Sequence, residues 1–555
     1  MSLPKDALQR TLFDTPVVVD DLFDAHDCYR LFRTHITPVL WQLRVHLAAL
    51  YCANNGRAAI EPAIMAGVTV LQYLEHVPDR RAVELVRFHL GWKFALELPL
   101  DFAGFHPTSL VTFRERLVAN GKEGLVFDAV VAKLQTAGLI KRRNKQRLDS
   151  THILGNVARM SRLEVVRETV RMAVELLAAA HGPRPHNWAT LRERYCETEV
   201  DWRCQDKEKL KKKIQQAGED CQAVLDCLEG HATLRKHPHT ATVRRVLHEQ
   251  FDLTTASLAQ KKKECAGALK NPHDPEAQWS AKDTKKETQW VGYKAQVAET
   301  VSVQPGAKNK GEPTTNFIVD ITTTEAIASD KDGMQRSLQA QAARGLDYPT
   351  EHFVDCAYVS GATLAQAQQR GAELMGPMQA GPQRAMGIYP TEAFDVDIAR
   401  RTATCPAGNT STEFCPIQDA YQGYSYYRIQ WGRQCDTCAQ QAQCTTSGAR
   451  RRVLCVGLRH DLTQARRREM LTPAFKERMH QRNAIEGTIS ELTRNGMRRT
   501  RYRGLAKTRL ANYFHGAACN IRRWLRLLAW ASMPERRGAK TRGFFSGMAG
   551  AAAAI

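Results

Sequence analysis

The first 135 residues place apolar side chains at the spacing of an α-helix. Ile64, Val68 and Leu71 recur at intervals of four and three residues, which puts them on one helix face. The pattern is broken by prolines, which cannot continue a helix interior, at Pro78, Pro99 and Pro107. We therefore expect a bundle of short helices over residues 1–135.

A longer helical pattern follows a short gap. Apolar residues keep helical spacing from Ser161 to Ala179, and Gly182-Pro183 ends the run. Residues 185 to 270 continue as a polar, Lys- and Glu-rich stretch that includes the charge run 207–213. The chain from 156 to 275 is predicted to be a helical insertion, and its charges are typical of a solvated surface.

Strand patterns frame this insertion. A short β-like run around Leu148–Ile153 predicts a strand within residues 136–155. Residues 289–298 and 316–322 predict an antiparallel pair, and the run 352–358 predicts a buried strand that ends in a turn.

Helical patterns near 331–344 and 361–372 separate the later strands, and the apolar run 386–389 is read as a last core strand. This order predicts an α/β fold with a mixed sheet, whose core spans residues 276–390.

The carboxyl-terminal part is helical again. Ile485, Ile489 and Leu492 share one face of a predicted helix, and a second apolar stripe runs from Ala511 to Leu525. We assign residues 461–535 to these basic helices and residues 536–555, which are rich in small side chains, to a flexible tail.

The net charge of the chain indicates the kind of partner that it binds. Its 79 Lys and Arg residues exceed its 58 Asp and Glu residues and give a net charge of +21. Such an excess favours a polyanion, because bound phosphates release their counterions. Nucleic acid is the expected partner.

No apolar run reaches about 18 residues, and the first residues lack the pattern of a signal peptide, so we expect a cytoplasmic protein without a membrane segment.

Three acids are the candidate catalytic residues. Asp149 is on a predicted strand, Asp355 near the end of another, and Glu486 beside the apolar stripe of a basic helix. Carboxylate oxygens are preferred ligands of Mg²⁺, and two metal ions about 4 Å apart can activate an attacking oxygen and stabilise a leaving one. For each acid alone, a turn or helix-capping role is the alternative.

A second candidate site is the cysteine-rich segment 391–460. Four thiolates could bind Zn²⁺ in a tetrahedron, and the candidates are Cys405, Cys435, Cys438 and Cys444, with Cys415 and Cys455 as possible replacements. Unpaired thiols in a reducing compartment are the alternative. Trp431 in the same segment could stack on a flipped base, but the core of a β-hairpin would use the same aromatic residues.

Several basic residues are candidate DNA contacts. A predicted helix from about Ser109 to Ala119 carries Arg114 and Arg116 and could be a recognition helix; a structural bundle with solvated arginines is the alternative. No acid occurs between Glu491 and Glu535. The remaining candidates are Arg482, Arg494, Arg498, Arg499, Arg501, Arg503, Lys507 and Lys294.

These segments together resemble the DDE-type insertion-sequence transposases whose ribonuclease H-like catalytic domain ends in a Tyr-Arg-Glu-Lys signature helix. The motifs that carry the resemblance are Leu71-Gln72-Tyr73-Leu74, Thr112-Phe113-Arg114-Glu115-Arg116-Leu117, Leu148-Asp149-Ser150-Thr151-His152, Trp290-Val291-Gly292-Tyr293-Lys294, Phe353-Val354-Asp355, and Arg482 followed by Glu486-Gly487. They run along most of the chain, and the signature selects Glu486 over Glu477 and Glu491.

The resemblance implies a function and its partners. It implies a ribonuclease H-like core, a pair of Mg²⁺ or Mn²⁺ ions on the three acids, cleavage at the inverted repeats of a mobile element and strand transfer into target DNA. It also implies double-stranded DNA as partner, a homodimer in the DNA complex and a place at the bacterial nucleoid.

The chain departs from the signature at two positions. Met479 stands at the tyrosine position and Thr493 at the lysine position, directly before Arg494, which could supply the missing phosphate contact by a small shift. A DNA-binding derivative with impaired catalysis, or a different ribonuclease H-like nuclease, are therefore the alternative functions. Asp283, Asp320 and Asp330 are rival acids, ranked below Asp355 because their surroundings match the family pattern less well.

Overall fold

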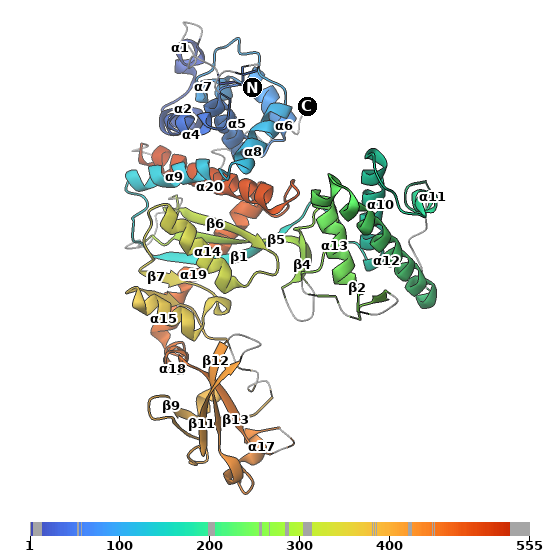
Figure 1. Cartoon of the computed structure of the whole chain (residues 1–555). Helices are drawn as coiled ribbons and strands as arrows, with labels where there is room; N and C mark the ends of the chain where they lie inside the picture. Colours follow the sequence, from blue (N-terminus) through green and yellow to red (C-terminus); the bar gives the residue numbers. More distant parts are fainter. Residues whose placement is uncertain are drawn as a thin grey trace.

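A computed structural model describes most of the chain. The described residues are 2–3, 14–52, 55–56, 58–197, 206–254, 258–262, 264–265, 267–282, 288–302, 313–379, 381, 383, 386–419, 424–446, 448 and 450–532. The tail predicted over 536–555 therefore lies outside them. Figure 1 shows four parts: a helical group, a central sheet below it, a helical insertion beside the sheet and a β-rich module at the far end.

The helical group is built around one buried helix. Every residue of α5 (Pro62–Glu75) except the last is buried, and it packs against helices before and after it in the sequence. The other helices are α1 (Thr15–Val18), α2 (Cys28–His35), α3 (Thr37–Gln42), α4 (Arg44–Ala48), α6 (Asp79–Phe88), α7 (Leu90–Ala95), α8 (Thr108–Ala119) and α9 (Leu125–Thr136). This matches the series of short helices that the prolines predict.

The central sheet is mixed, as predicted. Its strands are β1 (Gln146–Leu154), β4 (Gln278–Ala281), β5 (Gln289–Thr300), β6 (Ile318–Glu325), β7 (Glu351–Phe353) and β8 (Glu373–Met375). β5 pairs with β6 and β4 at one side and with β1 at the other, in each case antiparallel, whereas β1, β7 and β8 are parallel. The predicted antiparallel pair is confirmed as β5 and β6.

A glycine allows β1 and β5 to approach. Gly292 has a φ of 155°, and a Cβ atom there would lie 2.1 Å from the carbonyl oxygen of Ile153. No other residue fits this position without a backbone shift.

Two helices accompany the parallel strands. α14 (Asp330–Ala343) and α15 (Gly361–Gln369) confirm the predicted helices. The run 386–389, however, was wrongly interpreted as a core strand: it is a turn in which Met386 is exposed, and the last strand of the sheet is β8. Its end joins the β-rich module instead, where Tyr389 N donates to the carbonyl of Gln443.

The helical insertion enters between β1 and β4, the first two strands of the central sheet in chain order. It contains α10 (Arg162–Ala179), α11 (Trp188–Arg192), α12 (Lys207–Gly230) and α13 (Pro238–Gln250), with a small pair of strands, β2 (Phe251–Asp252) and β3 (Ala259–Gln260). Ser161 and Glu164 form a capping box that fixes the start of α10. The insertion has a hydrophobic core of its own, so it can pack without the sheet.

The β-rich module follows β8. Its elements are β9 (Asp395–Asp397), β10 (Thr402–Thr404), β11 (Glu413–Asp419), β12 (Tyr424–Gln430), α17 (Gln441–Cys444) and β13 (Val453–Gly457). Trp431 is 1% exposed in the small core of this module, and its indole Nε1 donates to the carbonyl of Asn409. The proposed base-stacking role of Trp431 is therefore wrong, and the alternative, a core aromatic, is confirmed.

Three α-helices follow the β-rich module in the described part of the chain: α18 (His460–Glu469), α19 (Pro473–Leu492) and α20 (Leu505–Ala531). α20 packs on β6, α5, α8 and α9 and so joins the sheet to the helical group (Figure 1). α19 packs against β1 and β7, and this contact brings the basic helix of Glu486 to the sheet.

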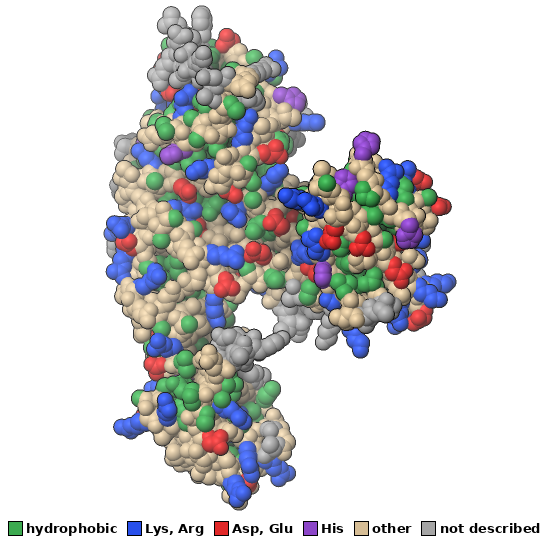
Figure 2. Space-filling view, in the orientation of Figure 1, with side chains coloured by type: hydrophobic (Ala, Val, Ile, Leu, Met, Phe, Trp, Pro, Cys, Tyr) green, Lys and Arg blue, Asp and Glu red, His purple; other side chains and the backbone are tan. Residues whose placement is uncertain are grey.

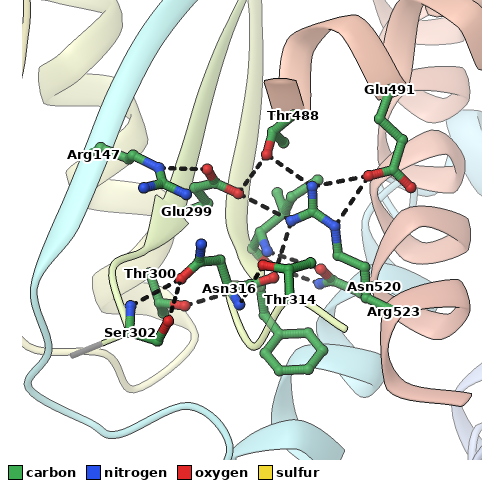
Figure 3. A network of polar contacts seen from close by, with 12 residues as sticks. Arg147, Glu299, Thr300, Ser302, Thr314, Asn316, Thr488, Glu491, Asn520 and Arg523 are labelled. Carbon is green, nitrogen blue, oxygen red and sulfur yellow. Dashed lines mark hydrogen bonds and ion pairs between the residues drawn. The ribbon is translucent and has the colours of Figure 1, made fainter. Parts of the chain in front are cut away.

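A buried carboxylate holds α19 and α20 to the sheet (Figure 3). Glu299 on β5 has no exposed surface, and its Oε1 accepts a hydrogen bond of 2.5 Å from Arg147 Nε on β1. Its Oε2 accepts from Thr488 Oγ1 on α19 at 2.7 Å and from Arg523 Nη1 on α20 at 3.0 Å. Arg523 also donates to Glu491 on α19. One side chain thus links two strands and two helices.

We expect Glu299→Gln to destabilise the fold by about 3–5 kcal/mol, because breaking a buried ion pair leaves the buried Arg147 without its carboxylate partner and weakens the pairing of Arg523. Urea unfolding measures the effect. Glu325→Gln is the matched control, since Glu325 pairs with Arg336 at a half-exposed site and its loss costs about 1 kcal/mol or less. Equal stability of the two variants would contradict this role for Glu299.

Candidate active site

Three elements bring the predicted acids to one cleft. Asp149 is in the middle of β1, Asp355 follows the end of β7, and Glu486 is in the third quarter of α19. All three line the same cleft of about 720 Å³. Positions more than 330 residues apart in the chain therefore face a common space.

A guanidinium group lies among the three carboxylates. Arg482 Nη2 is 3.1 Å from Asp149 Oδ2 and 3.9 Å from Asp355 Oδ2, and Arg482 Nη1 is 3.8 Å from Glu486 Oε1. Arg482 precedes Glu486 by one helical turn, so both side chains leave the same face of α19. The acids are thus arranged around one positive charge.

The acids differ in exposure. The side chain of Asp149 is 19% exposed, that of Asp355 47% and that of Glu486 70%. Burial raises the pKa of Asp149, although Arg482 opposes the shift, and the charge of Asp355 adds to it. A cation that enters the cleft would favour the ionised form of Asp149.

The cleft contains further charges. Asp330, at the start of α14, lines it too and is held by Lys294 Nζ at 3.3 Å and Gln296 Nε2 at 3.2 Å. Arg498 also lines the cleft, where its Nη1 donates to Thr151 Oγ1 and to the His152 carbonyl. Burial and the charge of Arg498 lower the pKa of His152 to about 4, so this imidazole is neutral at pH 7.

The faces of α19 explain the departures from the signature. Thr493 lines the acid cleft, as the lysine position of the signature requires, but Arg494 lines a different pocket on the other side of the helix. The idea that Arg494 replaces the missing lysine in the cleft by a small shift is therefore wrong, since adjacent helical residues point about 100° apart. Arg498 is the basic residue after Glu486 that reaches the cleft. Met479 packs beside Phe475, on the side of α19 that faces β7 and β8.

One predicted DNA contact is excluded by burial. Arg114 is 5% exposed, its guanidinium pairs with Asp79, and it lies over the ring of Tyr502. The interpretation of α8 as a recognition helix reading DNA through Arg114 is therefore wrong; the helix packs between α5 and α20. Arg116 lies over the ring of Tyr51 at 4.3 Å.

The other predicted contacts are distributed over the segment that follows α19. Arg499, Arg501 and Arg503 are exposed. Arg501 is 3.7 Å from Asp79, and Lys507 is 3.1 Å from Glu115 on α8. Figure 2 shows that basic side chains on the visible face are spread over every part of the molecule, with acids between them.

The cysteines of the β-rich module form a second cluster. Cys405, Cys435, Cys438 and Cys444 line one small cavity, together with Trp431 and Arg452. Cys415 and Cys455 are exposed on β11 and β13 and do not line it, so the structure excludes them as replacements. All cysteines that the structure describes are free thiols.

Neither cluster has the side-chain spacing of a bound ion. Among the described residues, no group of three or more His, Cys, Asp or Glu side chains is arranged as a metal site. In the acid cleft the Arg482 guanidinium lies between the carboxylates instead. Within the same part of the chain, no helix is long and apolar enough to cross a membrane.

The rival acids differ in burial and in position. Asp320 has no exposed surface and pairs with Arg344, while Asp283 lies outside the described residues. Of the two rivals that the structure describes, Asp330 reaches the cleft. Asp330 follows Ser329, the residue that caps the start of α14. This pattern indicates a helix start, but it does not indicate that the start of the helix faces the acid cleft.

Two known protein families match the chain. The family described as "Transposase DDE domain" matches residues 404–525, which include the β-rich module from β11 onward, α18, α19 and most of α20. The family described as "Transposase domain (DUF772)" matches residues 17–116 in the helical group. No curated protein and no solved structure matches the chain.

Proposed function

We propose that this chain, whose two family matches indicate an insertion-sequence DDE transposase, cuts DNA at the ends of a mobile element and joins them to target DNA at the cleft of Asp149, Asp355 and Glu486. The observation that carries the proposal is the convergence of these three acids on one cleft. The matched families describe transposition in general; the catalytic roles of the three residues are our assignment.

The donor set of the cleft fits divalent cations. Three carboxylates, from a strand, a strand end and a helix, surround one guanidinium, so the site already accommodates positive charge. Asp149, Asp355 and Glu486 would hold two Mg²⁺ or Mn²⁺ ions, which supply charge neutralisation at the phosphate and a lower pKa for an attacking water. Asp330 is engaged by Lys294 and Gln296, so we do not assign it to the same set.

The remaining residues of the cleft can bind and orient DNA. Arg482 and Arg498 present guanidinium groups to a phosphate that enters the cleft, and such groups can donate two parallel hydrogen bonds to it. Arg498 is held in place by Thr151 and the backbone of His152. It supplies the positive charge that Thr493 lacks, which supports an active enzyme over an impaired DNA-binding derivative.

We also propose that the core is ribonuclease H-like. The strand order supports this: β6, β5 and β1 are antiparallel neighbours, and β7 and β8 continue the sheet parallel to β1. Asp149 on the central strand and Asp355 after the adjacent strand then lie side by side. The homodimer on DNA remains a prediction from the family resemblance.

We expect Asp149→Asn, Asp355→Asn and Glu486→Gln each to reduce Mg²⁺-dependent cleavage of the element's end DNA by about 1000-fold or more. Loss of a metal ligand removes several kcal/mol of transition-state stabilisation, and each 1.36 kcal/mol is a factor of ten. Gel assays of cleavage and of joining to an unrelated plasmid measure both steps.

Glu477→Gln is the control for that experiment, because Glu477 is exposed on the same helix outside the cleft. Wild-type cleavage by the three cleft variants would reject the assignment. Cleavage without any joined product would favour the alternative, a nuclease.

For the cysteine cluster we propose a structural Zn²⁺ ion. Four thiols line a cavity of about 20 Å³, which has room for one water-sized particle. Two tight turns position Cys405 and Cys435: Gly408 N donates to the carbonyl of Cys405 and Cys438 N to that of Cys435. The small core of the module, with six buried residues, is of the kind that commonly needs a metal or disulfide.

An unsatisfied cation supports the same proposal. Arg452 is 7% exposed, and its Nη atoms donate to the carbonyls of Cys444 and Tyr389. Its buried Nε has no hydrogen-bond partner, and no ion pair of Arg452 with a carboxylate occurs within the described residues. A zinc ion with four thiolates carries two negative charges and would supply the missing counter-charge.

We expect the purified protein to contain one zinc per chain and Cys435→Ser to lose it, with a lower unfolding temperature of the module. Mass spectrometry of the metal and limited proteolysis of the β-rich module measure these effects. Cys415→Ser is the control, since its thiol is exposed away from the cavity. A zinc-free wild type, or equal zinc in both variants, would contradict the proposal.

A further inference from the structure

A second large cavity lies on the other side of α19. It has a volume of about 680 Å³ and is bounded by the end of α5, by α19 and by α20. Ala484, Gly487 and Thr488 of α19 face it, whereas Arg482, Glu486 and Ile489 face the acid cleft. One helix therefore separates the two spaces.

Basic side chains dominate this cavity, which we call the arginine pocket. Its lining includes Arg147, Arg494, Arg522, Arg523 and Arg526. Against these five guanidinium groups stand two carboxylates, Glu75 and Glu491. The Glu75 carboxylate is already occupied, because it accepts hydrogen bonds from Tyr29 and Trp92.

Three of the five arginines have structural partners. Glu299 binds Arg147 and Arg523, and Glu491 binds Arg522 and Arg523. These ion pairs hold β1, β5, α19 and α20 together (Figure 3). Among the described residues, neither carboxylate that lines the pocket forms an ion pair with the other two arginines, although the charge of Glu491 acts on one of them, Arg526.

Arg494 and Arg526 are these two. The contact found for Arg494 is a hydrogen bond to the carbonyl of Ser490, and the buried Nε of Arg526 has no partner. Within the described chain neither makes an ion pair with a carboxylate. Burial and then the neighbouring Arg522 lower the pKa of Arg526, and the charge of Glu491 opposes this shift.

We propose that the arginine pocket binds a backbone phosphate of the DNA through Arg494 and Arg526. The inference rests on the proposed function, which supplies the DNA. The planar fork of a guanidinium matches two phosphate oxygens. Because an α-helix with its side chains is about 10 Å wide, the pocket lies about three base pairs from the acid cleft at 3.4 Å per pair.

The position of the arginine pocket indicates what its contact with a DNA phosphate would do. A phosphate in the pocket would fix the duplex on the flank of α19 while the scissile phosphate lies at the acids. Leu74, Glu75 and His76 form one wall of the pocket. The amino-terminal helical group would therefore lie against the same DNA strand. The pocket would thus set the register of the DNA without taking part in the chemistry.

The test uses the full chain with a fluorescent end duplex in EDTA, where binding proceeds without cleavage. We expect Arg494→Ala and Arg526→Ala each to weaken binding about tenfold and to reduce the slope of log K against log salt by about one, as for the loss of one phosphate contact. Arg336→Ala is the control, because Arg336 on α14 is half exposed and paired with Glu325 on β6; it removes the same charge and should leave the slope unchanged.

The outcomes separate the two proposals. If the wild type binds no DNA, the proposed function fails. If it binds DNA and both arginine variants match the control in affinity and slope, the pocket inference fails alone. Calorimetry with inorganic phosphate tests a third outcome. If phosphate binding requires Arg494 and Arg526 while the variants keep their affinity for DNA, the pocket binds a free anion and the inference is overturned.

Discussion

The burial of one carboxylate, Glu299, is the constraint on which the site depends. A charge with no exposed surface is stable only when its partners are held in place, and those partners come from β1, α19 and α20. Arg147 is two residues before Asp149 on β1, and Thr488 is two residues after Glu486 on α19. The same hydrogen bonds that satisfy Glu299 therefore fix the strand of one catalytic candidate against the helix of another.

The different faces of helix α19 make different contacts. One face carries Arg482 and Glu486 into the acid cleft, a second carries Thr488 and Glu491 to the buried ion pairs, and a third packs Phe475 on the sheet. A helix held by contacts on three faces cannot rotate or slide without breaking one of them. This rigidity suits a site in which an acid 70% exposed, Glu486, has to meet two others from the sheet.

Much of this could be predicted from the sequence. Periodicity located α10, α14 and the β5–β6 pair, because local spacing follows local structure, and the order of short motifs selected Asp149, Asp355 and Glu486. Contacts across the chain could not be predicted. Arg114 looked exposed on a basic helix but pairs with Asp79, Arg494 turned to the far side of α19, and Asp330 reached the cleft, because each depends on helix phase and on partners distant in sequence.

The central claim is that the three acids form one cation site whose present occupant is the Arg482 guanidinium. Anomalous diffraction from crystals of the protein with Mn²⁺ tests it most directly. We expect manganese peaks about 2.0–2.6 Å from oxygens of Asp149, Asp355 and Glu486, with Arg482 displaced from between them. Manganese bound elsewhere, with Arg482 still among the carboxylates at saturating metal, would contradict it.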